Sequence, residues 1–395
     1  MTVLRDLIAH TAAGGWGSDA PNDGLFEVHV IRGADFPSVD KQRLIGLPVR
    51  YESNLIASTR CLEADDLIIE ISGGTKDRPT GRVVRITERA LGSVEGIKIP
   101  ASFCRLIRIN RTLANPAFIF YSLRNHYNSG GTWAYQNQST GLANFRFPQF
   151  AESYEIEPFS VPEQSAIAEV LGALDDKIAA NTQAIDLLDQ LGAAEVMRHT
   201  TGTHVALSSI AVITMGSSPP GADLSDVPAG IPFYQGVRDF GRRFPGFRIW
   251  TEKPVRTAEA GDTLLSVRAP VGRTNLARVR SCIGRGVASL RSTTGMPFTL
   301  YHLLATSERA WLPFESEGTV FGSINRKQLG AVLVPTIKPS AQTGLESRLA
   351  SFESLIAAAI TANEHLAATR DALLPALMSG KLRIKDAERV VSHAV

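Results

Sequence analysis

Arginine is the side chain whose distribution most directly suggests a chemistry in this chain of 395 residues. Residues 201–340 carry 16 Lys or Arg against 9 Asp or Glu, and most of these cations are Arg. Residues 161–200 carry only 2 cations against 7 acids. A guanidinium group donates paired hydrogen bonds to phosphates and to guanine edges. The segment 201–340 is therefore a candidate for nucleic-acid contact, although a basic segment is often simply soluble.

Patterns for enzymatic chemistry are weak by comparison. Asn115-Pro116-Ala117-Phe118 is similar to the Asn-Pro-Pro-aromatic motif of amino-methyltransferases, but Ala stands in the second Pro position and no glycine-rich cofactor loop precedes it. The three cysteines and the scattered histidines lack the spacing of a zinc site or a disulfide framework. We find no acidic pair at nuclease spacing and no Ser/Cys–His arrangement. We therefore expect a protein that is not an enzyme and that needs no cofactor or metal.

The elements that would position binding residues are two long helices. From Ser160 to about Leu191, and again from about Gln342 to Leu374, apolar residues alternate at spacings of four and three. This spacing is typical of a helix that lies along another helix. Because the chain must return past its first helix, we predict antiparallel pairing, with register set by one Asn in each seam. The predicted seam consists of Ile167, Leu171, Leu174, Ile178, Asn181, Ile185, Leu188, Leu345, Leu349, Phe352, Ile356, Asn363 and Leu366.

Each helix follows a globular segment, and the two segments are similar. VHVIRGADF (28–36) corresponds to IPFYQGVRDF (231–240), and EADDLIIEISGG (63–74) corresponds to EAGDTLLSVRAPVG (259–272). Asp66 then matches Asp262, and we expect both to shape a turn. The predicted fold is α+β, with two tandem mixed α/β domains separated by two long helices packed as an antiparallel coiled coil. The predicted boundaries are 1–159 and 201–339 for the domains, and 160–200 and 340–395 for the helices with the C-terminal tail.

These stretches resemble the specificity subunit of type I restriction–modification systems. The resemblance covers nearly the whole chain and includes VPEQSAIAEVLGALDDKI (161–178) and LLPALMSGKLRI (373–384). It implies two target recognition domains, each reading one half of a split, asymmetric target in double-stranded DNA. It also implies that the helices are a spacer and a docking site for two methyltransferase subunits, and through them for restriction and translocase subunits. The second helix lacks the Pro-Glu-Gln signature of the first, so the two docking surfaces need not be equivalent.

Loops rich in Gly, Ser, Gln and Arg are the predicted DNA contacts, because they offer backbone amides for phosphates and side chains for base edges. In the first domain the candidates are Trp16, Arg32, Lys41, Thr75, Lys76, Arg78, Tyr135, Gln136 and Gln138. In the second domain they are Ser217, Ser218, Gln235, Arg238, Arg242, Arg243, Arg268 and Arg273. For the methyltransferase we expect the outer face of the first helix, which carries Glu163, Glu169, Asp175, Asp176 and Asp186.

The alternative comes from a different class of protein: a scaffold that homodimerises through its helix seams and has no sequence preference on DNA. Gel filtration and a duplex-binding competition separate the two readings. No apolar run is long enough to cross a bilayer, and the N-terminal stretch lacks a signal-peptide core. We therefore expect a cytoplasmic protein without a membrane partner.

Overall fold

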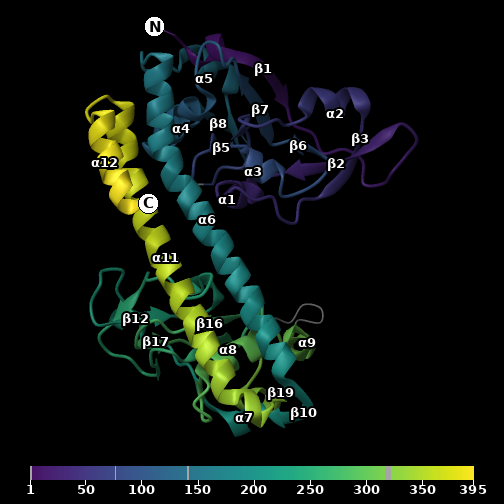
Figure 1. Ribbon diagram of the computed structural model, residues 1–395, viewed down its shortest axis with the longest axis vertical. Coiled ribbons are helices and arrows are strands. Elements are labelled where there is room, and N and C mark those ends of the chain that lie inside the picture. The colour runs from purple at the N-terminus through teal and green to yellow at the C-terminus, as the bar shows by residue number, and fades with distance from the viewer. Residues whose placement is uncertain (1, 76, 140–141, 316–321) are drawn as a thin grey trace. The chain divides into compact units, whose positions relative to one another are not determined.

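The computed structural model describes residues 2–75, 77–139, 142–315 and 322–395 (Figure 1). It divides into a first unit, Met1–Gln183 with Ala359–Val395, and a second unit, Ala184–Ala358. Helices α6 (Val161–His199) and α11 (Gln342–Met378) each contribute residues to both units. Helix α6 extends to His199, eight residues beyond the Leu191 predicted from the seam.

The main sheet of the first unit has the strand order β1-β7-β4-β5, and every neighbouring pair is antiparallel. The second sheet has the order β3-β2-β6, in which β2 pairs antiparallel with β3 and parallel with β6. The strands are β1 (Ile8–Ala13), β2 (Leu25–Ile31), β3 (Val49–Ser53), β4 (Leu67–Glu70), β5 (Val83–Arg85), β6 (Ile97–Pro100), β7 (Cys104–Ile109), β8 (Gln136–Ser139) and β9 (Leu142–Phe145). The helices are α1 (Phe36–Val39), α2 (Asn54–Arg60), α3 (Glu88–Leu91), α4 (Pro116–Asn128), α5 (Phe147–Ser153) and α12 (Ile384–Ala394).

The second unit repeats this topology. Its antiparallel sheet has the order β11-β18-β15-β16, and its other sheet has the order β13-β12-β17-β14 with β12 and β17 parallel. The strands are β10 (Thr200–Ala206), β11 (Ala211–Met215), β12 (Ile231–Tyr234), β13 (Trp250–Thr251), β14 (Thr257–Ala258), β15 (Thr263–Ser266), β16 (Thr274–Leu276), β17 (Ser281–Ile283), β18 (Val287–Ser292) and β19 (Leu333–Ile337). The helices are α7 (Leu207–Ile210), α8 (Pro297–Ala305), α9 (Glu308–Trp311) and α10 (Arg326–Ala331).

The central strand of each main sheet is buried along its whole length. In β4, Leu67 and Ile69 join a core with helices α4 and α6, whereas Ile68 faces a separate core on the other side of the sheet. Strand β15 is divided in the same way, with Leu265 in one core and Leu264 in another. Both faces are covered, so apolar residues stand at consecutive positions in these strands, Leu67–Ile69 and Leu264–Leu265, instead of alternating with exposed polar ones.

The helices α6 and α11 run antiparallel within each unit. In the first unit Asn181 contacts Asn363, and Asp175 lies earlier in α6 against Arg370, later in α11. In the second unit Glu195 of α6 pairs with Arg348 of α11. The predicted architecture, two mixed α/β repeats with an antiparallel pair of long helices, is confirmed.

Candidate functional site

The helix seam of the first unit is apolar with one polar layer. Ile167, Leu171, Leu174 and Leu366 are buried, and Ile178 is partly buried. In the polar layer the Asn181 amide donates a hydrogen bond of 2.9 Å to the Asn363 side-chain oxygen. The Asn363 amide in turn lies 3.3 Å from the Thr182 hydroxyl and 3.4 Å from the Ile178 carbonyl oxygen. A partly buried amide pair with these partners favours this register over others.

Next to this layer, α4 is attached to the helix pair through Asp175. The Tyr121 hydroxyl donates to one Asp175 oxygen at 2.7 Å, and Arg370 donates to the other at 2.6 Å. Arg124 adds a cation at 3.8 Å. Burial, together with the neighbouring Asp175 carboxylate, raises the pKa of Tyr121 well above its ordinary value. The prediction that Asp175 lies on an outer face is wrong, because this side chain is held between α4 and α11.

The seam of the second unit contains the remaining predicted positions. Ile185, Leu345, Leu349 and Ile356 are buried, and Leu188 and Phe352 are partly buried. At its end, Arg348 of α11 lies 3.0 Å from the Glu195 carboxylate of α6.

The cation that anchors the second unit to the helices is Arg243, which is only 1% exposed. Its guanidinium contacts the Asp189 carboxylate, lies 3.2 Å from Glu353 and stacks 4.3 Å above the centre of the Tyr301 ring. The His302 ring nitrogen Nε2 lies 3.1 Å from the other Glu353 oxygen. The prediction that Arg243 contacts DNA is therefore wrong, because its side chain is buried and pairs with the buried Glu353 and the partly buried Asp189.

The neighbouring Arg242 lies at the rim of this cluster and is about one-third exposed, as its side chain is 36% accessible. It contacts Asp186 and lies 3.8 Å from Asp189. Asp186 was expected on the outer face of the first helix, but it is partly buried beneath Arg242. Glu163, Glu169 and Asp176, by contrast, are exposed.

Three DNA candidates of the first unit gather around the hairpin between β4 and β5. Backbone hydrogen bonds join Thr75 and Arg78, and the Gln136 oxygen accepts from the backbone of the same hairpin at Thr80, 3.2 Å away. The Arg78 guanidinium lies 3.1 Å from the Glu70 carboxylate and donates a hydrogen bond of 2.6 Å to the Gly73 carbonyl oxygen. Thr75 is exposed.

The other first-unit candidates are spread over the surface. Trp16 is exposed with the Arg50 guanidinium 4.5 Å above its ring, and Lys41 is exposed. Arg32 forms a paired hydrogen bond with Asp35, at 3.0 and 2.8 Å. Tyr135 packs against Phe150. Gln138 lies in β8, and Lys76 lies outside the described residues.

In the second unit, backbone hydrogen bonds bring three candidate residues together. Ser217 donates its N–H to Ile283, the Ser218 hydroxyl accepts from the backbone of Arg285, and the Gln235 carbonyl accepts from Gly286. A Cβ on Gly286 would lie 2.4 Å from the Gln235 carbonyl oxygen, so only glycine permits this approach. Arg285 is exposed at the centre and was not predicted. The sequence feature that could have indicated Arg285 is the glycine on each side of it, Gly284 and Gly286.

Arg268 and Arg273 lie on the second unit's counterpart of the β4–β5 hairpin, between β15 and β16. Both side chains are exposed. The Ser266 hydroxyl donates to the Pro270 carbonyl at 2.6 Å and accepts from the Arg273 backbone at 2.8 Å, which closes the loop from inside. Arg238 is also exposed, in the 3-10 turn after β12.

The repeated aspartates shape turns, as predicted. Asp66 accepts from the backbone N–H of Glu63 at 2.7 Å and from Arg108 on β7 at 2.7 Å. Asp262 accepts from Glu259 at 2.9 Å and from Arg291 on β18 at 2.8 Å. Burial opposes ionisation of Asp262, but hydrogen bonds from Arg291, the Glu259 backbone and Ser289 outweigh it, so the pKa of Asp262 lies below its ordinary value.

Among the described residues, no group of three or more His, Cys, Asp or Glu side chains is arranged to hold a metal ion. Within the same part of the chain, none of the helices is long and apolar enough to span a membrane.

Comparison with known proteins gives one informative sequence match and several structural ones. A putative type I restriction enzyme specificity subunit, MjaX, of Methanocaldococcus jannaschii is 27% identical over 314 residues, which is 71% of this chain and 71% of that protein. No protein-family model matches the chain. The S subunit of a type I restriction–modification system from M. genitalium is 14% identical over 95% of both chains, with a TM-score of 0.57. The HsdS subunit from Thermoanaerobacter tengcongensis is 22% identical over 96% of both chains, with a TM-score of 0.36. The resemblance carried by the sequence is thus confirmed: this chain is similar to the specificity subunits of type I restriction–modification systems in sequence and shares the fold of an S subunit.

Proposed function

We propose that the chain is the DNA-recognition subunit of a type I restriction–modification complex and that each unit reads one half of a bipartite target. The observation that carries this proposal is the structural repeat. The units share strand orders β1-β7-β4-β5 and β11-β18-β15-β16, and each is anchored on the same pair of antiparallel helices. A duplicated reader is what a split target requires.

The halves of the target should differ, because corresponding surface loops differ. The β4–β5 hairpin presents Thr75 with Arg78 turned inward, whereas the β15–β16 hairpin presents Arg268 and Arg273 to solvent. In the second unit Arg285 adds a further exposed guanidinium group. Such groups hold phosphates, while Gln and Arg side chains distinguish base edges.

Docking of methyltransferase subunits on the helices is supported in the first unit by a groove of about 540 Å³ along α6. On the α6 side it is lined by small residues, Ala168, Gly172 and Ala173, and by the exposed carboxylates of Glu169 and Asp176. Arg85 and Arg111 of the globular part line the other side. Small side chains let the backbone of a partner approach closely. The restriction and translocase subunits would join through the methyltransferase.

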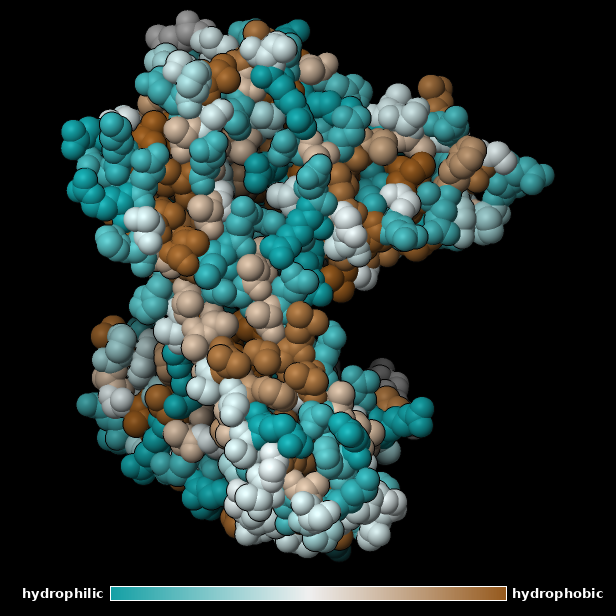
Figure 2. All heavy atoms as spheres, in the orientation of Figure 1, coloured by the Kyte–Doolittle hydropathy of each residue, from teal (hydrophilic) through white to brown (hydrophobic). Residues whose placement is uncertain are grey.

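In the second unit the helices expose apolar side chains instead. Leu187 and Leu191 of α6 are 58% and 47% exposed, and Leu355 of α11 is 57% exposed. Hydrophobic residues gather on the visible surface of the long helices in Figure 2. A patch of this kind indicates an interaction surface. The chemical difference from the α6 groove supports two docking surfaces that are not equivalent.

The homodimeric scaffold is disfavoured by the pairing within one chain. The Asn181–Asn363 hydrogen bond and the buried Leu345, Leu349 and Ile356 use the seams of α6 and α11 on each other. The seam residues are therefore covered and do not call for a second copy.

The test is to purify the chain with its cognate methyltransferase subunit and to map methylated adenines in a genome. We expect one bipartite, asymmetric motif. We also expect the isolated chain neither to methylate nor to cleave DNA. A genome without a bipartite motif, or methylation by the chain alone, contradicts the proposal.

A second test addresses the spacer between the half-sites. A one-turn insertion should be placed in both helices at the boundary between the units, after Gln183 in α6 and before Ala359 in α11, so that the Asn181–Asn363 layer and the Asp175 contacts are kept. We expect a longer spacer with unchanged half-sites, because a helical turn adds about 5.4 Å. An unchanged spacer would show that the helices do not set the distance.

A further inference from the structure

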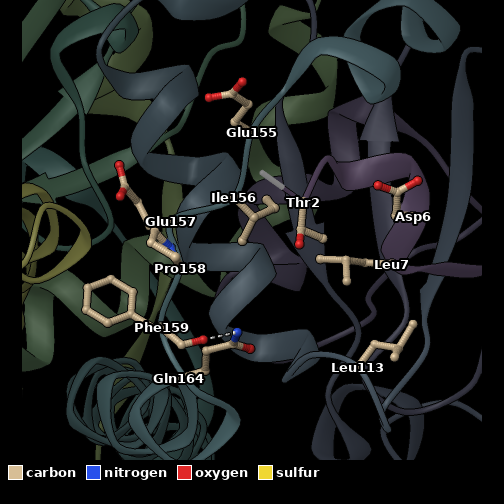
Figure 3. A pocket seen from close by; sticks show the side chains of 10 residues that line it. All are labelled: Thr2, Asp6, Leu7, Leu113, Glu155, Ile156, Glu157, Pro158, Phe159 and Gln164. Atoms are coloured by element: carbon tan, nitrogen blue, oxygen red, sulfur yellow. Dashed lines mark hydrogen bonds between the residues drawn. The ribbon is translucent and has the colours of Figure 1, made fainter.

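The first unit has a pocket of about 510 Å³ where α6 begins. Leu7, Ile156 and Phe159 form its apolar part, and Gln164 closes it from the helix. Figure 3 shows that the Gln164 amide is held by the Phe159 carbonyl oxygen, through a hydrogen bond of 3.0 Å. The volume is in the range of pockets that bind ligands or short peptide segments.

The second unit has an equivalent pocket where α11 begins, but its volume is only about 100 Å³. Gln342 occupies the position of Gln164, and its amide reaches the Ile337 carbonyl oxygen, 3.5 Å away. The segments that lead into α6 and α11 are also joined alike to the start of each globular part. Leu4 N–H donates to the Tyr154 carbonyl oxygen, and Leu207 N–H donates to the Val332 carbonyl oxygen. The pockets are therefore two versions of one feature of the repeat.

The difference between the pockets is charge as well as size. The first is rimmed by three exposed carboxylates, Asp6, Glu155 and Glu157, and Figure 3 shows them along one side of the apolar residues. The matching backbone bonds align these acids with Ser209, Leu333 and Pro335 in the second unit. The second pocket is thus small and lacks the acidic rim.

We propose that the first-unit pocket docks a basic, partly apolar segment of the methyltransferase subunit, and that the second-unit pocket docks none. A Lys or Arg side chain fits the chemistry, because its aliphatic stem can lie against the exposed Leu113 and the partly buried Phe159 while its charged end meets the carboxylates. This inference rests on the proposed function. It adds that the two methyltransferase subunits of the complex are held unequally.

The test uses the full chain with its cognate methyltransferase subunit and measures stoichiometry by native mass spectrometry and affinity by titration. Glu155→Lys/Glu157→Lys reverses the rim, and Leu113→Arg places a competing cation at the pocket from the chain itself. Asp23→Lys/Glu95→Lys is the matched control, because both acids are exposed in the same unit and the charge change is identical. Thermal melting verifies that each variant is folded.

We expect both pocket variants to weaken binding of one of the two methyltransferase subunits by on the order of tenfold, with the control within about twofold. The loss should shrink at high salt, because rim charges are screened. Unchanged binding of both subunits by the two pocket variants overturns this inference alone. A wild-type chain that binds no methyltransferase subunit overturns the proposed function as well.

Discussion

In each unit a carboxylate of a long helix connects the helix pair to the globular part, and the cation that pairs with this carboxylate differs between the units. Asp175 of α6 and Glu353 of α11 occupy equivalent places in the repeat. Each carboxylate contacts a side chain of a helix in the preceding globular part, Tyr121 in α4 or His302 in α8. In the first unit the balancing cation is Arg370, which comes from the partner helix. In the second unit it is Arg243, which comes from the globular part between β12 and β13.

A glycine explains why the second unit cannot use the first arrangement. Gly192 of α6 corresponds to Arg370 of α11, and a Cβ at Gly192 would lie 2.6 Å from the His302 ring. The helix therefore supplies no cation there, and a loop of the globular part inserts Arg243 instead. The comparison teaches that the carboxylate of the second unit takes its cation from a loop of the globular part, whereas the equivalent carboxylate of the first unit takes it from the partner helix α11.

The largest expected effect is that of Arg243→Met. Removing this cation leaves Glu353 and Asp189 without their buried partner, which should cost about 3–5 kcal/mol of unfolding free energy. Urea unfolding of the full chain measures it. The control is Arg280→Met, whose ion pair with Glu259 is exposed and should be worth less than about 1 kcal/mol.

Arg243→Lys separates charge from geometry if the Met variant does not fold. Lysine keeps the charge but cannot form the planar contacts to two carboxylates and a ring, so its stability should lie between wild type and the Met variant. A Met variant as stable as wild type would show that the cluster does not anchor the second unit.

Arg370→Met should have a smaller effect than Arg243→Met, at about 1.5–3 kcal/mol. After the change the Asp175 carboxylate still has the Tyr121 hydroxyl at 2.7 Å and the Arg124 guanidinium at 3.8 Å. Its negative charge therefore keeps a hydrogen-bond donor and a nearby cation. The same urea series compares the two variants directly. A larger loss of unfolding free energy for Arg370→Met than for Arg243→Met would contradict this order of effects.

The glycine argument is tested by two matched changes in one helix. Gly192→Ala should destabilise by about 1–3 kcal/mol, because the new methyl group overlaps the His302 ring. Gly172→Ala in the same helix has its nearest atom, the Tyr121 hydroxyl oxygen, 4.0 Å away and should stabilise by up to about 1 kcal/mol. Melting temperatures that move in the same direction would contradict the proposed crowding at Gly192.

The smallest expected effect is the pH dependence of Asp262. Its pKa in the folded chain lies below the ordinary 3.8, so its contribution to stability is present above that value and is lost as pH falls through the lowered pKa. Asp262→Asn should flatten this acid limb in a pH series of urea midpoints. Asp226→Asn, an exposed control, should leave it unchanged. If the urea midpoints of wild type and Asp262→Asn fell equally as the pH is lowered, Asp262 would not contribute to the pH dependence of stability.

Patterns that recur in the sequence predicted the fold well. The alternating spacing located both helices and their Asn layer, and the matched EADD and EAGD stretches located equivalent turns. The seam pattern extends only to about Leu191, whereas α6 continues to His199. Gly192 is accommodated inside the helix against His302, and Glu195 is held by Arg348 beyond it.

The candidate site was predicted less well, since neighbouring identical residues have different environments. Arg242 and Arg243 are indistinguishable by type, yet packing buries one among carboxylates and leaves the other at the rim. Asp175 and Asp176 differ in the same way. Periodicity locates a helix but does not indicate which loop will reach it from the globular part, so these assignments needed the tertiary structure.

The central claim is that each unit reads its own half of one target. The most direct measurement is adenine-methylation mapping in cells that express the cognate methyltransferase subunit with wild type, with Arg268→Ala/Arg273→Ala or with Thr75→Arg. We predict a bipartite motif whose one half is relaxed by the second-unit change and whose other half is altered by the first-unit change. A change in both halves from either variant, or a motif that neither affects, would contradict the claim.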